Sequence, residues 1–147
     1  MKAINHYQLK ALFADVPVIF PPRDLSYFPV SVEWATGEGA IAFDFWLKDQ
    51  NVPGWEKKFQ CEDFADAFSL WLRFRHRESI RPEEAPAVAT LFYRVEGGLS
   101  GHAINVLPQW AEGKNGLELV PVFIEPNGCH RVRLTPWERN NQLGVQW

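Results

Sequence analysis

One stretch of the sequence decides the fold: Cys61-Glu62-Asp63-Phe64-Ala65-Asp66-Ala67-Phe68-Ser69-Leu70-Trp71-Leu72-Arg73-Phe74-Arg75. Its apolar residues recur at intervals of three and four, which is the spacing of one helix face. Acidic residues lead the first turn and arginines close the last, in agreement with the helix dipole. The spacing therefore predicts a core helix over residues 61–75, with one buried face.

The sequence before this helix is rich in proline and aromatic residues. A short helix is expected within residues 1–14, because Pro17 ends any helical pattern there. The prolines of residues 16–32 indicate a loop that packs over the core and walls a pocket. Residues 30–34 and 41–46 alternate like the limbs of a β-hairpin, although the second limb also fits a helix. Residues 51–54 have the composition of a turn.

The sequence after the helix favours strands. A polar connection over residues 79–86 leads to strand-like runs at 87–95, 102–107 and 117–124, with a fourth at 131–134. We therefore expect one α+β domain over residues 1–147, in which the core helix packs on an antiparallel sheet. Residues 1–50 form its aromatic, proline-rich part, and residues 51–147 form its core, which would carry any catalysis.

Composition excludes several classes of function. The chain has 147 residues, and its 15 Lys+Arg against 18 Asp+Glu leave a net charge of -3. No basic cluster suits a phosphate backbone, so we expect no nucleic-acid partner. No run approaches the roughly 18 apolar residues of a membrane span, so no membrane partner is expected. Two cysteines and the lack of a signal-peptide pattern indicate a reducing, cytoplasmic setting. The oligomeric state stays open.

Three residues are candidates for chemistry. Cys61 lies at the start of the predicted helix, where the backbone N–H groups and the dipole stabilise a thiolate. A small buried hydrophobe is the alternative role for this cysteine. His102 lies where a glycine-rich turn enters a strand. Glu125 lies at the end of the following predicted strand, directly before a turn. These positions give a nucleophile, a general base and a carboxylate that orients the base.

The predicted hairpin tests whether His102 and Glu125 meet. A register that places them opposite each other turns between Gly113 and Lys114. This point lies within residues 112–116, which have the strongest turn composition of the C-terminal half. Opposed side chains in such a pair are close enough for Glu125 to accept a hydrogen bond from Nδ1–H of the imidazole.

Three short blocks resemble a known family. Cys61-Glu62-Asp63-Phe64-Ala65, Gly101-His102-Ala103-Ile104-Asn105 and Phe123-Ile124-Glu125-Pro126 are similar to the C-D-D-F-A, G-H-A-x-N and x-x-E-P blocks of a papain-like cysteine-hydrolase group. That group includes the C-terminal protease domain of the Marasmius agglutinin and related bacterial and phage proteins. The resemblance implies a papain-like fold, with Cys61 as nucleophile, His102 as general base and Glu125 as orienter. It implies a structural role for Asp63.

The remaining site predictions concern an oxyanion hole, a metal site and a cofactor. Trp55, six residues before Cys61, has an indole N–H for an oxyanion hole, and Gln50, Asn51 and Gln60 compete for that role. No metal site is expected, because neither cysteine has the spacing of a zinc ligand set. No cofactor is expected. Calcium is associated with the family that the chain resembles, but the acidic residues of this chain form no EF-hand pattern; they are Asp44, Asp49, Glu62, Asp63 and Asp66.

The sequence thus predicts a cysteine hydrolase that cleaves a peptide or isopeptide bond in a protein or peptide substrate through an acyl-enzyme. Transglutaminase-like acyl transfer uses the same three residues. The alternative from another class is a non-catalytic binding or inhibitory module, as in a phage or mobile-element protein. A third is a domain that is active only with a larger partner. Accessibility and ionisation of the Cys61 thiol separate an enzyme from a binding module.

Overall fold

The computed structural model describes residues 2–52, 54–57, 59–77 and 84–147. Within it, residues Cys61–His76 form helix α4. Asp63 Oδ2 accepts the backbone N–H of Gln60 at 2.8 Å, which satisfies a donor at the start of the helix. The predicted core helix is therefore confirmed. Its buried face comprises Phe64, Ala65, Phe68, Trp71 and Leu72.

A six-stranded sheet packs against α4, in the order β2-β9-β5-β6-β7-β8. The strands are β2 (Val18–Phe20), β5 (Ala89–Arg94), β6 (Gly101–Gly113), β7 (Gly116–Glu125), β8 (His130–Val132) and β9 (Gln142–Gln146). Among the described residues, β2 and β9 are the one pair of this sheet that runs parallel. A Cβ on Gly144 would lie 2.7 Å from Ile19 Cδ1, so a larger residue there would require the exposed Ile19 side chain of β2 to shift.

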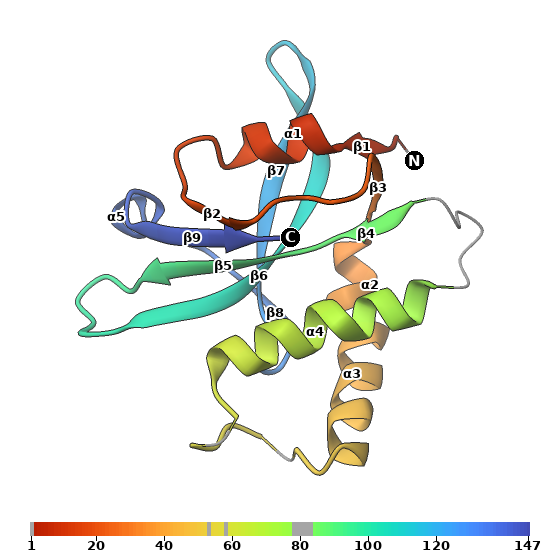
Figure 1. The fold of residues 1–147 in the computed structure, drawn as a ribbon, viewed down its shortest axis with the longest axis vertical. Helices are drawn as coiled ribbons and strands as arrows, with labels where there is room; N and C mark the ends of the chain where they lie inside the picture. Colours follow the sequence, from red (N-terminus) through yellow and green to blue (C-terminus); the bar gives the residue numbers. More distant parts are fainter. Residues whose placement is uncertain (1, 53, 58, 78–83) are drawn as a thin grey trace.

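A smaller sheet, in the order β1-β3-β4, lies beside the first. Its strands are β1 (Ile4–Asn5), β3 (Ser26–Pro29) and β4 (Ala85–Ala87). Two further helices are α1 (His6–Leu12), which confirms the N-terminal helix, and α5 (Pro136–Arg139). Figure 1 shows α4 and α3 (Glu38–Asp49) below β5 and β9, and α1 above β2 and β9, where it crosses the β6–β7 hairpin, whose tip extends beyond it. Helices with mainly antiparallel sheets confirm the α+β class.

Several sequence predictions of local structure are wrong or fall outside the described residues. Residues 16–32 were expected to form a loop, but they contribute β2 and β3, whose partners are far away in sequence. Most of the connection at 79–86, and Pro53 in the turn at 51–54, lie outside the described residues. Asn51, in that turn, has a positive φ of 60°. No helix of the described part is long and apolar enough to cross a membrane.

The predicted hairpin at residues 30–46 is wrong, and the helical alternative for residues 41–46 is confirmed. The chain forms α2 (Val32–Thr36) and α3 (Glu38–Asp49) instead. A strand would bury Ile41, Phe43 and Phe45 together, but only Phe43 is buried, while Ile41 and Phe45 are 62% and 65% exposed. Burial at Gly39, Phe43 and Leu47 follows a spacing of four, which is helical.

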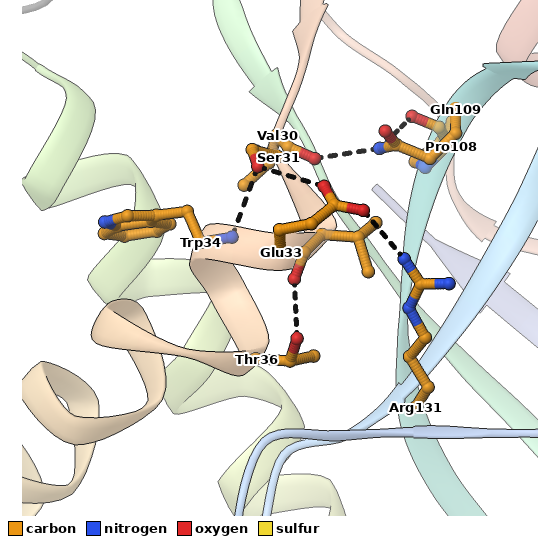
Figure 2. Close-up of polar contacts among 9 residues, drawn as sticks. Val30, Ser31, Glu33, Trp34, Thr36, Pro108, Gln109 and Arg131 are labelled. Atoms are coloured by element: carbon orange, nitrogen blue, oxygen red, sulfur yellow. Dashed lines mark hydrogen bonds and ion pairs between the residues drawn. The ribbon is translucent and has the colours of Figure 1, made fainter.

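Side-chain hydrogen bonds hold α2 in place (Figure 2). Ser31 Oγ accepts the backbone N–H of Trp34 at 3.2 Å and so caps the helix. Glu33 pairs with Arg131 at 3.1 Å, which joins α2 to β8. Gln109 Nε2 of β6 donates to Val30 O at 2.8 Å. The segment before α3 is thus fixed to the large sheet at two points.

The β6–β7 hairpin differs from the predicted register. Its ladder runs from Asn105 opposite Ile124 to Gly113 opposite Gly116, so the tip is at residues 114–115. Gly116, with φ of 109°, follows the tip, and the hairpin therefore closes later than predicted. Continuing this register places Glu125 opposite Ile104, and His102 becomes a diagonal neighbour.

Asn105 joins α4 to the sheet. Its side chain is fully buried, and Nδ2 donates to Ala65 O at 2.9 Å and lies 3.1 Å from Ser69 Oγ on α4, and 3.4 Å from Ala89 O of β5. The surrounding core combines both halves of the chain, since Val30 and Phe43 share a cluster with Leu107 and Ile124. One buried amide therefore sets the position of α4 on β5 and β6.

We expect Asn105→Ala to destabilise the protein by about 2–3 kcal/mol, because two backbone carbonyls lose a buried donor. Urea unfolding followed by circular dichroism measures this change. Asn140→Ala is the matched control, because Asn140 is exposed at the end of α5. Equal stability of the two variants would show that Asn105 does not hold α4 on the sheet.

Candidate functional site

Cys61 and His102 line one pocket, which we call the thiol pocket. Its volume is about 290 Å³. The first turn of α4 contributes Cys61 and Glu62, and the start of β6 contributes residues 101–103. Phe92 and Leu143 complete the lining. The structure therefore brings together two residues that are far apart in the sequence.

The electrostatics of the thiol differ from the prediction. Burial raises the pKa of the Cys61 thiol, and its hydrogen bond to the Glu62 carboxylate raises it further, against a smaller opposing effect of the Ala103 backbone. The thiol donates to Glu62 Oε2 at 3.2 Å. Within the described residues no hydrogen bond joins it to His102. The helix N-terminus alone favours a thiolate, but these two effects oppose it and keep the thiol protonated.

His102 and Glu125 form the contact that the sequence predicts. His102 Nε2 lies 2.6 Å from Glu125 Oε2, whereas the prediction used Nδ1. Glu125 Oε1 accepts the backbone N–H of Asn127 at 3.2 Å, which fixes the carboxylate at the end of β7. Tyr93, the cross-strand partner of His102, packs its ring edge-on at 5.9 Å. Burial and nearby carboxylates raise the pKa of Tyr93 to about 12.

The other predicted site residues lie elsewhere. Trp55 is 60% exposed and does not line the thiol pocket. Asp44 pairs with Lys48 at 2.6 Å, and Asp63 accepts the Gln60 N–H. Among the described residues, no group of three or more histidine, cysteine or acidic side chains is arranged to hold a metal ion. The acidic residues named for calcium therefore do not fit a cation site.

A second pocket, the α4–β9 pocket, lies between the exposed face of α4 and the β2–β9 edge. Its volume is about 400 Å³. Its aromatic side chains are Phe20 and Trp147, and its charged ones are Arg23, Asp66 and Arg73; Ser69, Leu70, Thr90 and Gln146 complete the lining. Phe20 of β2 and Arg23 line this pocket, so residues 16–32 contribute to a pocket wall as predicted, although part of the segment is strand rather than loop.

Sequence reasoning missed the α4–β9 pocket. Asp66, Ser69, Leu70 and Arg73 recur at intervals of three and four opposite the buried face, and this spacing was visible in the sequence. Phe20 and Gln146, however, meet the helix only because β2 pairs with β9. No local signal predicts a parallel pair of such short strands.

Comparisons with known proteins give fold relatives only. No protein-family model matches the chain, and no curated protein matches it. The solved structure "PSL1a-E64 complex" matches with a TM-score of 0.70 and 16% identity, over 99% of this chain and 51% of that one. A Polyporus squamosus lectin bound to the human-type influenza-binding epitope Neu5Acα2-6Galβ1-4GlcNAc matches with a TM-score of 0.64 and 17% identity, over 99% and 49%.

The chain thus spans about half the length of these neighbours and shares their fold. Both neighbours are lectins, and this finding contradicts the prediction of a cysteine hydrolase that acts on a protein or peptide substrate. It equally contradicts the peptidase and catalytic-triad interpretation. The assignment of Cys61, His102 and Glu125 as site residues stays a prediction. The raised pKa of Cys61 agrees with this correction, because a protonated thiol is a poor nucleophile.

We expect alkylation of Cys61 by iodoacetamide to be slow at neutral pH and to accelerate only as the pH rises past the ordinary pKa of a thiol. Glu62→Gln removes the carboxylate, lowers the pKa and should accelerate labelling at neutral pH several-fold. Peptide mass spectrometry measures both rates. Cys129 is the internal control, because burial raises its pKa to about 12. Labelling of Cys61 that is rapid at neutral pH and insensitive to Glu62→Gln would contradict this electrostatic account.

Proposed function

We propose that this chain is a carbohydrate-binding domain and that the α4–β9 pocket holds the sugar. One observation carries the proposal: the pocket combines two aromatic side chains with a set of hydrogen-bonding groups on rigid elements. Sugars have apolar C–H faces that pack on aromatic rings and hydroxyl groups that both donate and accept hydrogen bonds. A site for a sugar therefore needs both kinds of side chain in one concave surface.

The polar groups of this pocket are already ordered. Asp66 Oδ1 accepts from Gln146 Nε2 at 2.7 Å and from Thr90 Oγ1 at 3.4 Å, so three elements hold one carboxylate. Burial raises the pKa of Asp66, and these two hydrogen bonds oppose that effect. The second carboxylate oxygen is left to accept a sugar hydroxyl. An ordered site loses little conformational entropy when a ligand binds.

The fold relatives support this choice of ligand class. One neighbour is a Polyporus squamosus lectin whose bound epitope is a sialylated glycan, and it has the fold of this chain over 99% of the chain's length. This chain spans about half of that protein. The fold comparison does not identify a binding site in this chain, and the aromatic and polar side chains of the α4–β9 pocket identify one.

We expect Phe20→Ala to weaken glycan binding by on the order of 1 kcal/mol, or about fivefold in Kd, because one stacking face is lost. Titration calorimetry against Galβ1-4GlcNAc and sialylated oligosaccharides measures the change. Phe20 is 51% exposed, so the fold is retained. Phe45→Ala is the matched control, since Phe45 is an exposed aromatic outside the pocket. Equal affinities of the two variants, or no binding to any glycan by the unaltered chain, would refute this site.

A second candidate function is small-molecule binding in the thiol pocket. The specific observation in its favour is the solved complex of PSL1a with E64, whose fold this chain shares. In this chain Cys61 and His102 line a pocket, and Glu125 orders the imidazole of His102 from outside that pocket. This candidate requires binding only, without turnover.

We expect E64 to raise the thermal unfolding midpoint of this chain, and His102→Gln and Cys61→Ser to abolish the shift, because both side chains line the thiol pocket. Differential scanning fluorimetry measures it. Cys129→Ser is the control, since Cys129 is buried outside this pocket. An unchanged midpoint in the presence of E64 rules out this second function and leaves the carbohydrate site untouched.

The finer fold assignment stays a prediction. We infer from the three sequence blocks that the chain is papain-like in its topology. The support is their placement, since the blocks lie at the start of α4, in β6 and at the end of β7. It also stays a prediction that residues 1–147 form one domain, with an aromatic, proline-rich part at 1–50 and a core at 51–147.

A further inference from the structure

We propose that a third pocket, between α3 and the turn that joins β7 to β8, binds a small organic ammonium ion whose charge is held by Asp44. We call it the α3 pocket. Its volume is about 300 Å³, which is at the lower end of the range of small-molecule sites. Residues of α3, Val52, Gly54, Phe64 of α4 and residues 126–129 line it. It shares no residue with the thiol pocket or the α4–β9 pocket, so the proposal is independent of the carbohydrate site.

One wall of the α3 pocket is an apolar face of its helix. Ala40, Phe43 and Leu47 recur at intervals of three and four, so they lie on the same side of α3. Phe64 of α4 belongs to the same core cluster as Phe43 and Leu47. Ile41 extends this wall outward and is 62% exposed. An apolar group in the pocket therefore removes the Ile41 side chain from water.

A second wall is the turn at residues 126–129, and its backbone is fixed by its own contacts. Gly128 and Cys129 have positive φ angles of 95° and 47°. Cys129 Sγ donates to Pro126 O at 3.5 Å, and Glu125 Oε1 accepts the backbone N–H of Asn127 at 3.2 Å. A wall that is ordered in this way loses little conformational entropy when a ligand binds.

The charge of the α3 pocket is negative. Asp44 is the one charged residue among the described residues that line it, and its side chain is 57% exposed. Burial is the main cause that raises the pKa of the Cys129 thiol to about 12, and the carboxylates of Glu125 and Asp44 raise it further. Their negative potential therefore reaches the buried wall of the pocket, where it favours a cation and disfavours an anion.

The chain itself already places an ammonium group at this carboxylate. Lys48 Nζ lies 2.6 Å from Asp44 Oδ2 and 6.0 Å from the centroid of the Phe45 ring. Both side chains of this ion pair are more than half exposed, so the pair contributes little to stability and opens at small cost. Lys48 does not line the pocket, so its own stem does not fill it. A ligand ammonium that displaces Lys48 keeps the contact with Asp44 and adds the burial of an apolar body.

The test compares benzylamine, which is an ammonium ion at neutral pH, with benzyl alcohol and benzoate. The three probes share one apolar ring and differ in charge. NMR titration of the backbone amides gives their Kd values on the unaltered chain, on Asp44→Asn and on Lys48→Gln. Both substitutions break the same exposed ion pair, so an effect on folding is common to them, whereas their effects on binding are opposite. Asp49→Asn is the matched control, because Asp49 is exposed on α3 and does not line the pocket.

We expect benzylamine to bind the unaltered chain about fivefold more tightly than benzyl alcohol, and benzoate to bind more weakly than both. Asp44→Asn should abolish this preference, and Lys48→Gln should strengthen benzylamine binding about twofold or more, because the competing ammonium is gone. Asp49→Asn should behave as the unaltered chain. Equal binding of amine and alcohol, a preference that persists in Asp44→Asn, or weaker amine binding by Lys48→Gln overturns the inference.

The same titration locates the ligand. Benzylamine should shift the amide signals of Asn127 and Gly128, which line the α3 pocket, and leave that of Gln146 in the α4–β9 pocket unchanged. Shifts at Gln146 alone, or no shift at any amide, overturn the inference. The glycan titrations are unaffected by either result, so the failure of this site and the failure of the carbohydrate site are separate outcomes.

Discussion

The buried amide of Asn105 is the constraint on which the rest of the structure depends. Its Nδ2 atom contacts α4 at Ala65 and Ser69 and β5 at Ala89. A helix that packs through apolar contacts alone can slide or rotate by a turn at modest cost, whereas a directional hydrogen bond in a water-free interior fixes one position. The first turn of α4, with Cys61, and its exposed face, with Asp66 and Arg73, therefore both have defined places relative to the sheet.

One helix thus supplies two different pockets from two of its surfaces. At the start of α4, the helix dipole favours the thiolate form of Cys61, whereas burial and the hydrogen bond to Glu62 favour the protonated thiol. The second influence prevails, so the side chain behaves as a weak donor. Along its outer face, the polar residues face β9 and β2. The chemistry of each surface follows from its neighbours more than from the residue types on the helix.

Prediction from the sequence succeeded where the signal was local and periodic. The core helix, the three long strands of the C-terminal half and the β6–β7 turn have patterns that span many residues. The alternation of Ile41, Phe43 and Phe45 predicts a strand where the structure has a helix, because strand and helix patterns both place apolar residues four positions apart. The His102–Glu125 contact was found with a wrong register, since a long carboxylate reaches a diagonal neighbour as well. The predicted low pKa of the Cys61 thiol is wrong because burial, and then the hydrogen bond to Glu62, raise this pKa, and neither effect follows from a position at the start of a helix. The lectin neighbours contradict the hydrolase prediction.

The pairing of β2 with β9 has a consequence for the order of folding. Within the described part of the chain, residues 18–20 pair in the large sheet with β9 alone. Nearly the whole chain lies between these strands, so the pair closes a very long loop for only three residues of β2. The few contacts of β2 compensate the entropy lost in closing this loop only after β9 has already paired with β5. The edge of the sheet should therefore assemble last and open first, independently of the interior around α4.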